Sequence, residues 1–143
     1  GCRVPLPWFG DSPPFGFSAS GEAWLPVPAE WVALTRQRQR DDDGSMLRLY
    51  IAALALRRAV VAASEQPTWT WSELGPDVLA GRRPGLVSVT NLGARAVDAA
   101  PILSPQHERL LSSDPSGVTA ATGHGAAMVT PDTTIWFSDE RSG

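Results

Sequence analysis

Residues 2–18 read CRVPLPWFGDSPPFGFS, and this stretch decides how the rest of the chain is interpreted. It holds four prolines, two glycines and four aromatic residues, without the periodicity of a helix or strand. Proline holds its φ at about −65° and favours extended geometry in the residue before it. The pattern therefore predicts a stiff aromatic loop, which loses little conformational entropy when it borders a ligand.

Part of this loop resembles a known sequence signature. Residues 3–8 (RVPLPW) and 16–18 (GFS) are similar to the Arg-Thr-Pro-Met-Gln-Trp and Gly-Phe-Ser segments of α-glucosidases in the α-amylase superfamily, glycoside hydrolase family 13. Val4, Leu6 and Pro7 stand where the signature has Thr, Met and Gln. The resemblance implies a loop after the seventh strand of a (β/α)8 barrel, at the border of the sugar pocket.

The resemblance continues along the chain in the order of the family. Residues 22–28 (EAWLPVP) look like its Trp-(Leu/Ile)-Pro segment, and residues 43–58 look like its last barrel helix. More loosely, residues 85–92 (GLVSVTNL) and 129–136 (VTPDTTIW) are similar to strands of its C-terminal β domain. This implies a fragment with residues 1–64 from the end of the catalytic barrel and residues 65–143 from the C-terminal domain.

Local patterns in the first half predict irregular structure followed by helices. Six prolines make residues 1–28 irregular, and a short helix is expected over residues 29–35. Residues 36–43 combine arginines with three aspartates and are expected to form a solvated hinge. A longer helix is expected over residues 44–62, capped by Asp43, with an apolar stripe too wide for a single packing partner.

The second half has the pattern of short strands. Residues 68–71, 86–92, 108–111 and 133–137 are β-prone and are separated by turn residues such as Pro84-Gly85. This spacing is typical of an antiparallel β-sandwich, so the chain is assigned to an α+β class. Residues 117–127, rich in Gly, Ala and Thr, are expected to form a mobile loop.

Composition excludes several classes of function. The 143 residues include 43% hydrophobic residues and carry a net charge of −3, which fits a soluble protein and gives no electrostatic case for nucleic-acid binding. No membrane segment is expected, because arginines interrupt the most apolar window, residues 46–63. The single cysteine, Cys2, cannot form an internal disulfide and is compatible with the cytoplasm.

The sequence holds no candidate for the catalytic groups of a glycosidase. Retaining glycosidases use two carboxyl groups, and the family implied by the resemblance carries a further Asp in an Asn-His-Asp motif. Here His107 precedes Glu108 and His124 precedes Gly125, so that motif is absent. We therefore expect the catalytic carboxylates to lie upstream of this chain. The two histidines and one cysteine have no zinc-binding spacing, and no cofactor is expected.

Arg3 and Trp8 are the candidate substrate-binding residues. The resemblance implies that Arg3 contacts sugar hydroxyls, for which a guanidinium offers five fixed donors. Arg3 could instead bind a neighbouring carboxylate, and Trp8 could stack on a sugar ring or serve as a packing anchor. The other five tryptophans are expected in the core or at a domain interface: Trp24, Trp31, Trp69, Trp71 and Trp136.

The resemblance implies the C-terminal part of a retaining α-glucosidase that hydrolyses short α-glucosides, with the missing N-terminal barrel as its partner. Two alternatives remain open. One is a non-enzymatic β-sandwich accessory or carbohydrate-binding module. The other is a fragment of a transglycosylating relative, such as a sucrose isomerase or trehalose synthase.

Overall fold

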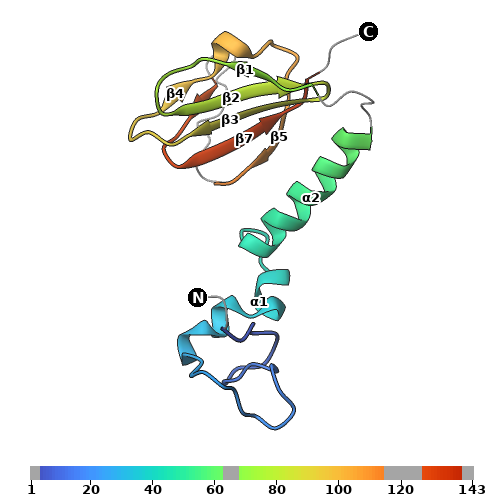
Figure 1. Cartoon of the computed structure of the whole chain (residues 1–143), viewed down its shortest axis with the longest axis vertical. Coiled ribbons are helices and arrows are strands. Elements are labelled where there is room, and N and C mark those ends of the chain that lie inside the picture. Colours follow the sequence, from blue (N-terminus) through green and yellow to red (C-terminus); the bar gives the residue numbers. More distant parts are fainter. Residues whose placement is uncertain (1–3, 63–67, 115–126, 140–143) are drawn as a thin grey trace. The chain divides into compact units, whose positions relative to one another are not determined.

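The computed structural model describes residues 4–62, 68–114 and 127–139 (Figure 1). The chain divides into two compact units, Gly1–Ala52 and Ala53–Gly143, called here the N-terminal and the C-terminal unit. The domain boundary predicted at residues 64 and 65 falls outside the described residues and stays a prediction. The helices are η1 (Ala29–Leu34), α1 (Arg36–Arg40), α2 (Met46–Ala62) and η2 (Ala100–Ile102). The strands are β1 (Thr70–Ser72), β2 (Val78–Arg83), β3 (Leu86–Asn91), β4 (Val97–Asp98), β5 (Arg109–Ser112), β6 (Met128–Val129) and β7 (Thr133–Phe137).

The proline-rich start of the chain is irregular, as expected, but it is held together by a buried aromatic residue. Residues 4–28 contain no helix or strand. Phe15 is fully buried, and its carbonyl oxygen accepts hydrogen bonds from the backbone N–H groups of Trp8 (2.8 Å) and Phe9 (3.0 Å). The loop thus folds back on itself around one side chain.

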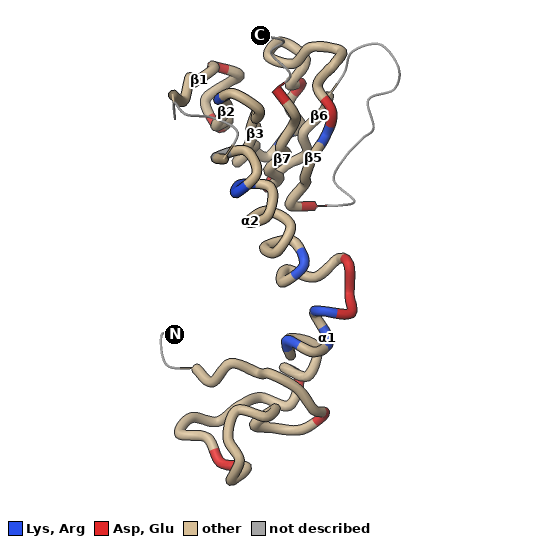
Figure 2. Tube along the Cα trace, turned by 90° about the vertical axis from the view of Figure 1, so that its right-hand side faces the viewer, with Lys and Arg blue, Asp and Glu red and all other residues tan. Residues whose placement is uncertain are grey.

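The structure corrects the expectation of a hinge at residues 36–43. The arginine-rich half forms α1, and the predicted short helix before it is present as the 3-10 helix η1. The buried Thr35 explains why the chain turns helical again, since its Oγ1 accepts from the Arg38 N–H at 3.3 Å and donates to the Val32 carbonyl at 2.9 Å. Figure 2 shows the acidic residues on the connection between α1 and α2.

The predicted N-cap of α2, Asp43, was wrong, and the observed N-cap lies two residues later in the sequence. Ser45, not Asp43, caps α2, because the Ser45 Oγ accepts from the Arg48 N–H at 3.2 Å. Asp43 instead forms an exposed ion pair with the Arg48 guanidinium at 3.0 Å. A serine hydroxyl placed three residues before a helical N–H is a favoured N-cap, so the helix begins where the local geometry supplies one.

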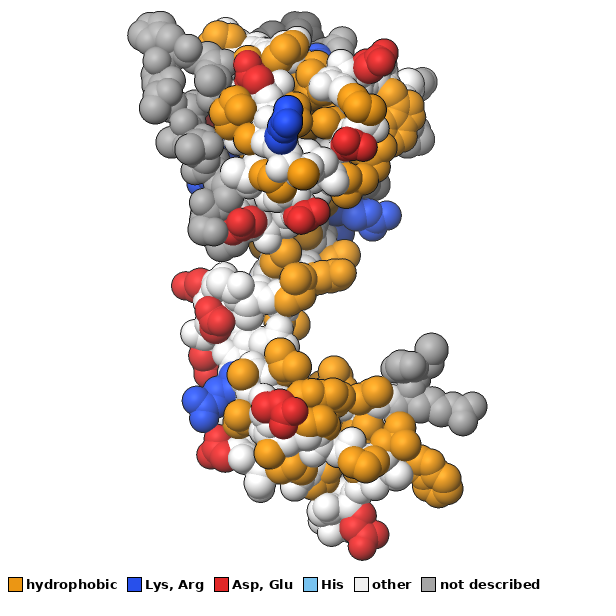
Figure 3. Space-filling model, turned by 90° about the vertical axis from the view of Figure 1, so that its left-hand side faces the viewer, with side chains coloured by type: hydrophobic (Ala, Val, Ile, Leu, Met, Phe, Trp, Pro, Cys, Tyr) orange, Lys and Arg blue, Asp and Glu red, His pale blue; other side chains and the backbone are white. Residues whose placement is uncertain are grey.

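The wide apolar stripe expected on α2 is present and largely uncovered. Met46, Tyr50, Ile51 and Leu54 are all exposed. Near the C-terminal end of the helix, Val60 is buried. Figure 3 shows hydrophobic side chains along this helix and over the N-terminal unit. Contiguous apolar surface of this kind marks a site that another polypeptide or a ligand covers.

The C-terminal unit is built on a five-stranded antiparallel sheet with the strand order β1-β2-β3-β7-β5 (Figure 1). A second, two-stranded sheet pairs β4 with β6. The turn predicted at Pro84-Gly85 connects β2 to β3, since Arg83 pairs with Leu86. The strands expected over residues 68–71, 86–92, 108–111 and 133–137 are found as β1, β3, β5 and β7, within two residues at each end.

Alternation along the central strands separates an inner from an outer face of the large sheet. Val87 and Val89 of β3 are fully buried, whereas Ser88 and Thr90 between them are half-buried. The inner residues form one core with residues of neighbouring segments: Ala80, Val87, Val89, Ala99, Val129, Ile135 and Phe137. Val129 belongs to β6, so the small sheet contributes to the same core as the large one.

The α+β class and the antiparallel sheet are therefore confirmed, while the barrel origin of the first half and the sandwich remain predictions. The strand β2 was missed because VLAGRR lacks a clear period-two pattern and contains a glycine. The loop expected over residues 117–127 lies outside the described residues except for Ala127.

Candidate functional site

Trp8, one of the two predicted sugar-contacting residues, has a fixed backbone and a partly free side chain. Its N–H donates to the Phe15 carbonyl at 2.8 Å, and its carbonyl accepts from the Gln37 N–H at 3.0 Å. The residue is 42% exposed. An indole held in this way loses little entropy on binding, because its backbone is already ordered.

The loop around Trp8 is tied to the first turn of α1. The Pro7 carbonyl accepts from the Arg36 N–H at 3.0 Å, and the Gly10 N–H donates to the Gln37 Oε1 at 3.3 Å. Asp11 and Arg38 add an ion pair at 2.9 Å, which is exposed and contributes little energy. The backbone hydrogen bonds, which the sequence did not reveal, are what position the loop.

The loop presents several exposed apolar side chains. Gly16 has a φ of +69°, and a Cβ at this position would overlap the Phe9 ring, so only glycine allows the ring to lie there. The exposed members of this surface, called here the aromatic loop surface, are Val4, Leu6, Trp8, Phe9 and Phe17.

Arg3, the other predicted contact, lies outside the described residues. The structure therefore positions Trp8 on the aromatic loop surface and leaves the role of Arg3 a prediction. The partial exposure of Trp8 is compatible with stacking on a ligand as well as with partial packing.

Of the five remaining tryptophans, which were expected in the core or at a domain interface, two do not lie in the core of their own unit, and for these two the interface stays a prediction. Trp24 is 95% exposed in the N-terminal unit and Trp71 is 68% exposed in the C-terminal unit. Trp31, Trp69 and Trp136 are half-buried. Tryptophan content alone does not distinguish core from surface, because this choice depends on strand pairing and on which face a strand buries.

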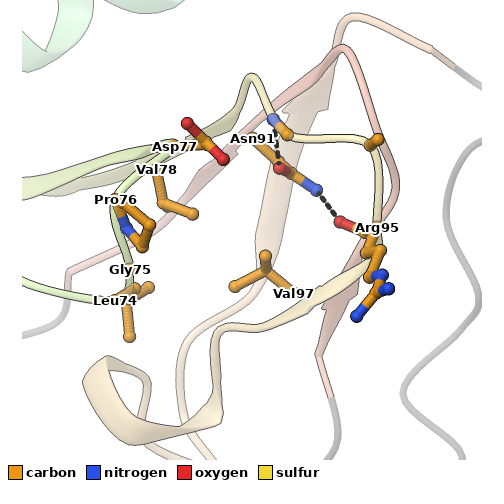
Figure 4. Close-up of a pocket in the computed structure, with 10 residues that line it drawn as sticks. Leu74, Gly75, Pro76, Asp77, Val78, Asn91, Arg95 and Val97 are labelled. Carbon is orange, nitrogen blue, oxygen red and sulfur yellow. Dashed lines mark hydrogen bonds between the residues drawn. The ribbon is translucent and has the colours of Figure 1, made fainter.

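A shallow hollow of about 320 Å³ lies in the C-terminal unit, between the segment before β2 and the loop after β3 (Figure 4). Its polar centre is Asn91, which is fully buried and is the only asparagine in the sequence. Its Nδ2 donates to the carbonyls of Arg95 (2.8 Å) and Val129 (2.9 Å), and its Oδ1 accepts from the Gly93 N–H at 2.9 Å. Because these bonds occupy the amide, Asn91 organises the loop rather than offering groups to a ligand.

Sequence reasoning missed a second polar cluster, formed by His107 and Asp139. Both side chains are buried, and the His107 Nε2 lies 3.1 Å from the Asp139 Oδ1. The His107 Nδ1 accepts from the Ser104 backbone N–H at 2.6 Å, so Nε2 carries the proton and donates to the carboxylate. The Arg82 Nη1 approaches the same carboxylate at 4.0 Å. Residues 32 positions apart carry no local signal of this pairing.

Although Ser, His and Asp occur together here, the geometry does not activate a nucleophile. The Ser104 Oγ lies 3.2 Å from the His107 Nδ1, but the backbone N–H of the same serine is closer and uses the acceptor lone pair. A general base needs that lone pair free to take the hydroxyl proton. The cluster therefore joins the start of β5 to the end of β7.

The described residues offer neither a metal-binding cluster nor a membrane-spanning helix. No group of three or more His, Cys, Asp or Glu side chains in residues 4–62, 68–114 and 127–139 could hold a metal ion. Among the described helices, none has the length and apolar character needed to cross a membrane.

Comparison with known proteins identifies the fold. No family model matches the sequence, and no curated protein sequence matches it. The structure is similar to trehalose-6-phosphate hydrolase from Bacillus licheniformis, with a TM-score of 0.71, 19% identity and coverage of 96% of this chain and 25% of that one. It is also similar to trehalulose synthase MutB from Pseudomonas mesoacidophila MX-45, with a TM-score of 0.70, 24% identity and coverage of 95% and 25%.

Both neighbours are α-amylase family enzymes, so the resemblance first seen in the sequence is confirmed at the level of the fold. The similarity extends over almost the whole of this chain, including the irregular N-terminal unit. The chain spans about a quarter of the length of each of these proteins. One structure of the trehalulose synthase contains its substrate sucrose.

Proposed function

We propose that this chain is part of a retaining α-glucosidase of the α-amylase superfamily, which hydrolyses short α-glucosides. The observation that carries the proposal is the agreement between the motif order over residues 1–58 and a fold match covering 95–96% of the chain with sugar-converting enzymes. The proposed catalytic carboxylates lie outside residues 1–143, because the sequence lacks the Asn-His-Asp motif of the family. The chain alone should therefore be inactive.

In the proposed enzyme, the aromatic loop surface borders the substrate site. The Trp8 ring would cover one face of a bound glucose, and Arg3 would donate hydrogen bonds to its hydroxyl groups. Both contributions position the sugar, while nucleophile and acid come from the missing part of the enzyme.

The same proposal accounts for the exposed apolar stripe of α2, because the missing barrel would pack against it. A helix with exposed Met46, Tyr50, Ile51 and Leu54 is costly to leave in water. In a (β/α)8 enzyme such a helix packs on the barrel, so we infer that the preceding barrel segments cover this stripe. This is also the reason to prefer an enzyme fragment over a free-standing accessory module.

A second candidate, a transglycosylating sucrose isomerase, is favoured by one observation, the similarity to trehalulose synthase at 24% identity. Hydrolase and isomerase share the glycosyl-enzyme step and differ in what attacks it, water or the released sugar. The fold does not discriminate between them.

The test is to express the reading frame that continues upstream of Gly1 together with this chain, with residues 1–143 alone as the control. The joined protein should release glucose from isomaltose, maltose or an aryl α-glucoside, and residues 1–143 should give the rate of a blank. Sucrose converted into an isomeric disaccharide without free glucose would favour the second candidate. A joined protein that processes no α-glucoside would refute the proposal.

A further inference from the structure

One residue of α1, Gln37, holds the N-terminal loop at two points, one on each side of Phe9. Its backbone N–H donates to the Trp8 carbonyl at 3.0 Å, and its side-chain Oε1 accepts from the Gly10 N–H at 3.3 Å. The two hydrogen bonds close a ring over residues 8–10. The orientation of this short turn therefore depends on a residue 27 positions after Gly10 in the sequence.

The start of α1 explains why the backbone contact forms. The first N–H groups of a helix have no acceptor inside the helix. In α1, the Arg36 N–H donates to the Pro7 carbonyl at 3.0 Å, and the Gln37 N–H donates to the Trp8 carbonyl. Any residue other than proline would supply the second of these bonds. The identity of the side chain at position 37 thus matters only for the contact with Gly10.

The side chain of Gln37 orients a residue that packing does not fix. Gly10 has a φ of +89°, and among the described residues no atom beyond its chain neighbours lies within 4 Å of the position a Cβ would take. Glycine changes its backbone conformation at little cost. Without an acceptor at position 37, the peptide bond between Phe9 and Gly10 would be free to rotate directly after Trp8.

We propose that Gln37 is a positioning residue for substrate binding, which orients the Trp8 indole by fixing the turn of residues 8–10. The proposal rests on the proposed function, in which the Trp8 ring covers one face of a bound glucose. Gln37 acts through the loop and does not touch the sugar. A stacked ring contacts the sugar in the ground state and in the transition state alike, so disturbing it raises KM and leaves kcat unchanged.

A neighbouring ion pair does not replace this contact. Asp11 and Arg38 meet at 2.9 Å, but their side chains are 83% and 62% exposed, and exposed pairs contribute little. Arg38 follows Gln37 in α1, so its substitution disturbs the same stretch of the chain without removing the acceptor of Gly10. This makes Arg38 the matched control position.

The experiment measures kcat and KM of the joined enzyme with an aryl α-glucoside. Gln37→Met keeps the length of the side chain but offers no oxygen to the Gly10 N–H, and it should raise KM about threefold to tenfold at unchanged kcat. Gln37→Glu retains an acceptor oxygen and should restore the KM of the wild type. Arg38→Met introduces the same side chain one residue later and should change neither constant.

A double-mutant cycle separates positioning from a general effect on stability. If Gln37 acts through Trp8, then Gln37→Met should hardly change KM in an enzyme that already carries Trp8→Ala. The same rise in KM in both backgrounds would overturn the proposal. It would also be overturned by a Gln37→Met enzyme with the KM of the wild type and only a lower Tm, or by a Gln37→Glu enzyme as impaired as Gln37→Met.

Hydrogen exchange at residues 8–10 of the joined enzyme tests the geometry without relying on activity. The Gly10 amide should exchange faster in Gln37→Met than in the wild type or in Gln37→Glu, and equal rates would overturn the proposal. An active enzyme whose KM does not respond to Gln37→Met would refute this inference alone. An inactive enzyme that still shows the difference in exchange would refute the proposed function.

Discussion

Replacing Asn91 by aspartate should strongly destabilise the C-terminal unit, although the change exchanges only an NH2 group for an oxygen. The Nδ2 of Asn91 donates two hydrogen bonds, at 2.8 and 2.9 Å, to the carbonyls of Arg95 and Val129. In Asn91→Asp, a carboxylate oxygen faces these two carbonyl oxygens at a fully buried position.

The magnitude follows from this geometry. Each lost hydrogen bond contributes about 1 kcal/mol, and a buried charge without a donor adds further cost. We expect a loss of at least about 3 kcal/mol at pH 7, or more than about 10 °C in Tm for a unit of this size. Burial among carbonyls raises the folded-state pKa of the new carboxyl above its unfolded value of about 3.9. The deficit should therefore be smallest below that value and should grow as the pH rises.

Urea unfolding followed by circular dichroism measures the loss, and hydrogen exchange in β3 and β7 locates it in the C-terminal unit. Gln37→Glu is the matched control, since it makes the same amide-to-carboxylate change at an exposed site and keeps the oxygen that accepts from Gly10. If Asn91→Asp unfolds within about 0.5 kcal/mol of this control, the described role of Asn91 is wrong.

Three further substitutions test the N-terminal loop, the buried pair of His107 and Asp139, and the proposed substrate contact of Arg3. Gly16→Ala should destabilise the N-terminal unit by about 1–3 kcal/mol, whereas Gly21→Ala, with a similar φ but open space around it, should cost less; equal urea midpoints would contradict this. Asp139→Ala leaves the His107 N–H without its acceptor and should cost about 1–3 kcal/mol in urea unfolding; an unchanged midpoint would show that the pair contributes nothing. Arg3→Lys in the joined enzyme should lower kcat/KM by about one to two decades, because lysine lacks the planar donor fork; an unchanged kcat/KM with a lower Tm would make Arg3 structural.

The local features of the chain could be read from its sequence. Proline positions predicted the irregular N-terminal loop, and the apolar spacing of residues 44–62 predicted α2. Alternating β-prone residues predicted β3 and β7, and Pro84-Gly85 predicted the turn between β2 and β3. These signals are local, because propensity, φ restriction and turn chemistry act within a few residues.

Contacts between distant residues were decided only by the tertiary structure. Ser45 rather than Asp43 caps α2, since the choice between nearby polar residues depends on the path of the chain. His107 meets Asp139 because β5 and β7 are neighbours in the sheet.

The tryptophans of the C-terminal unit show most clearly what the sequence determined and what it did not. The sequence by itself determined that Trp69, Trp71 and Trp136 lie in or next to strands, since their neighbours are β-prone. Whether a ring enters the core or points to the solvent depends on register, and a shift of one residue moves it to the opposite face. Strand pairing alone placed Trp71 and Trp136 on one outer face, with Gly81 and Ser88 between them.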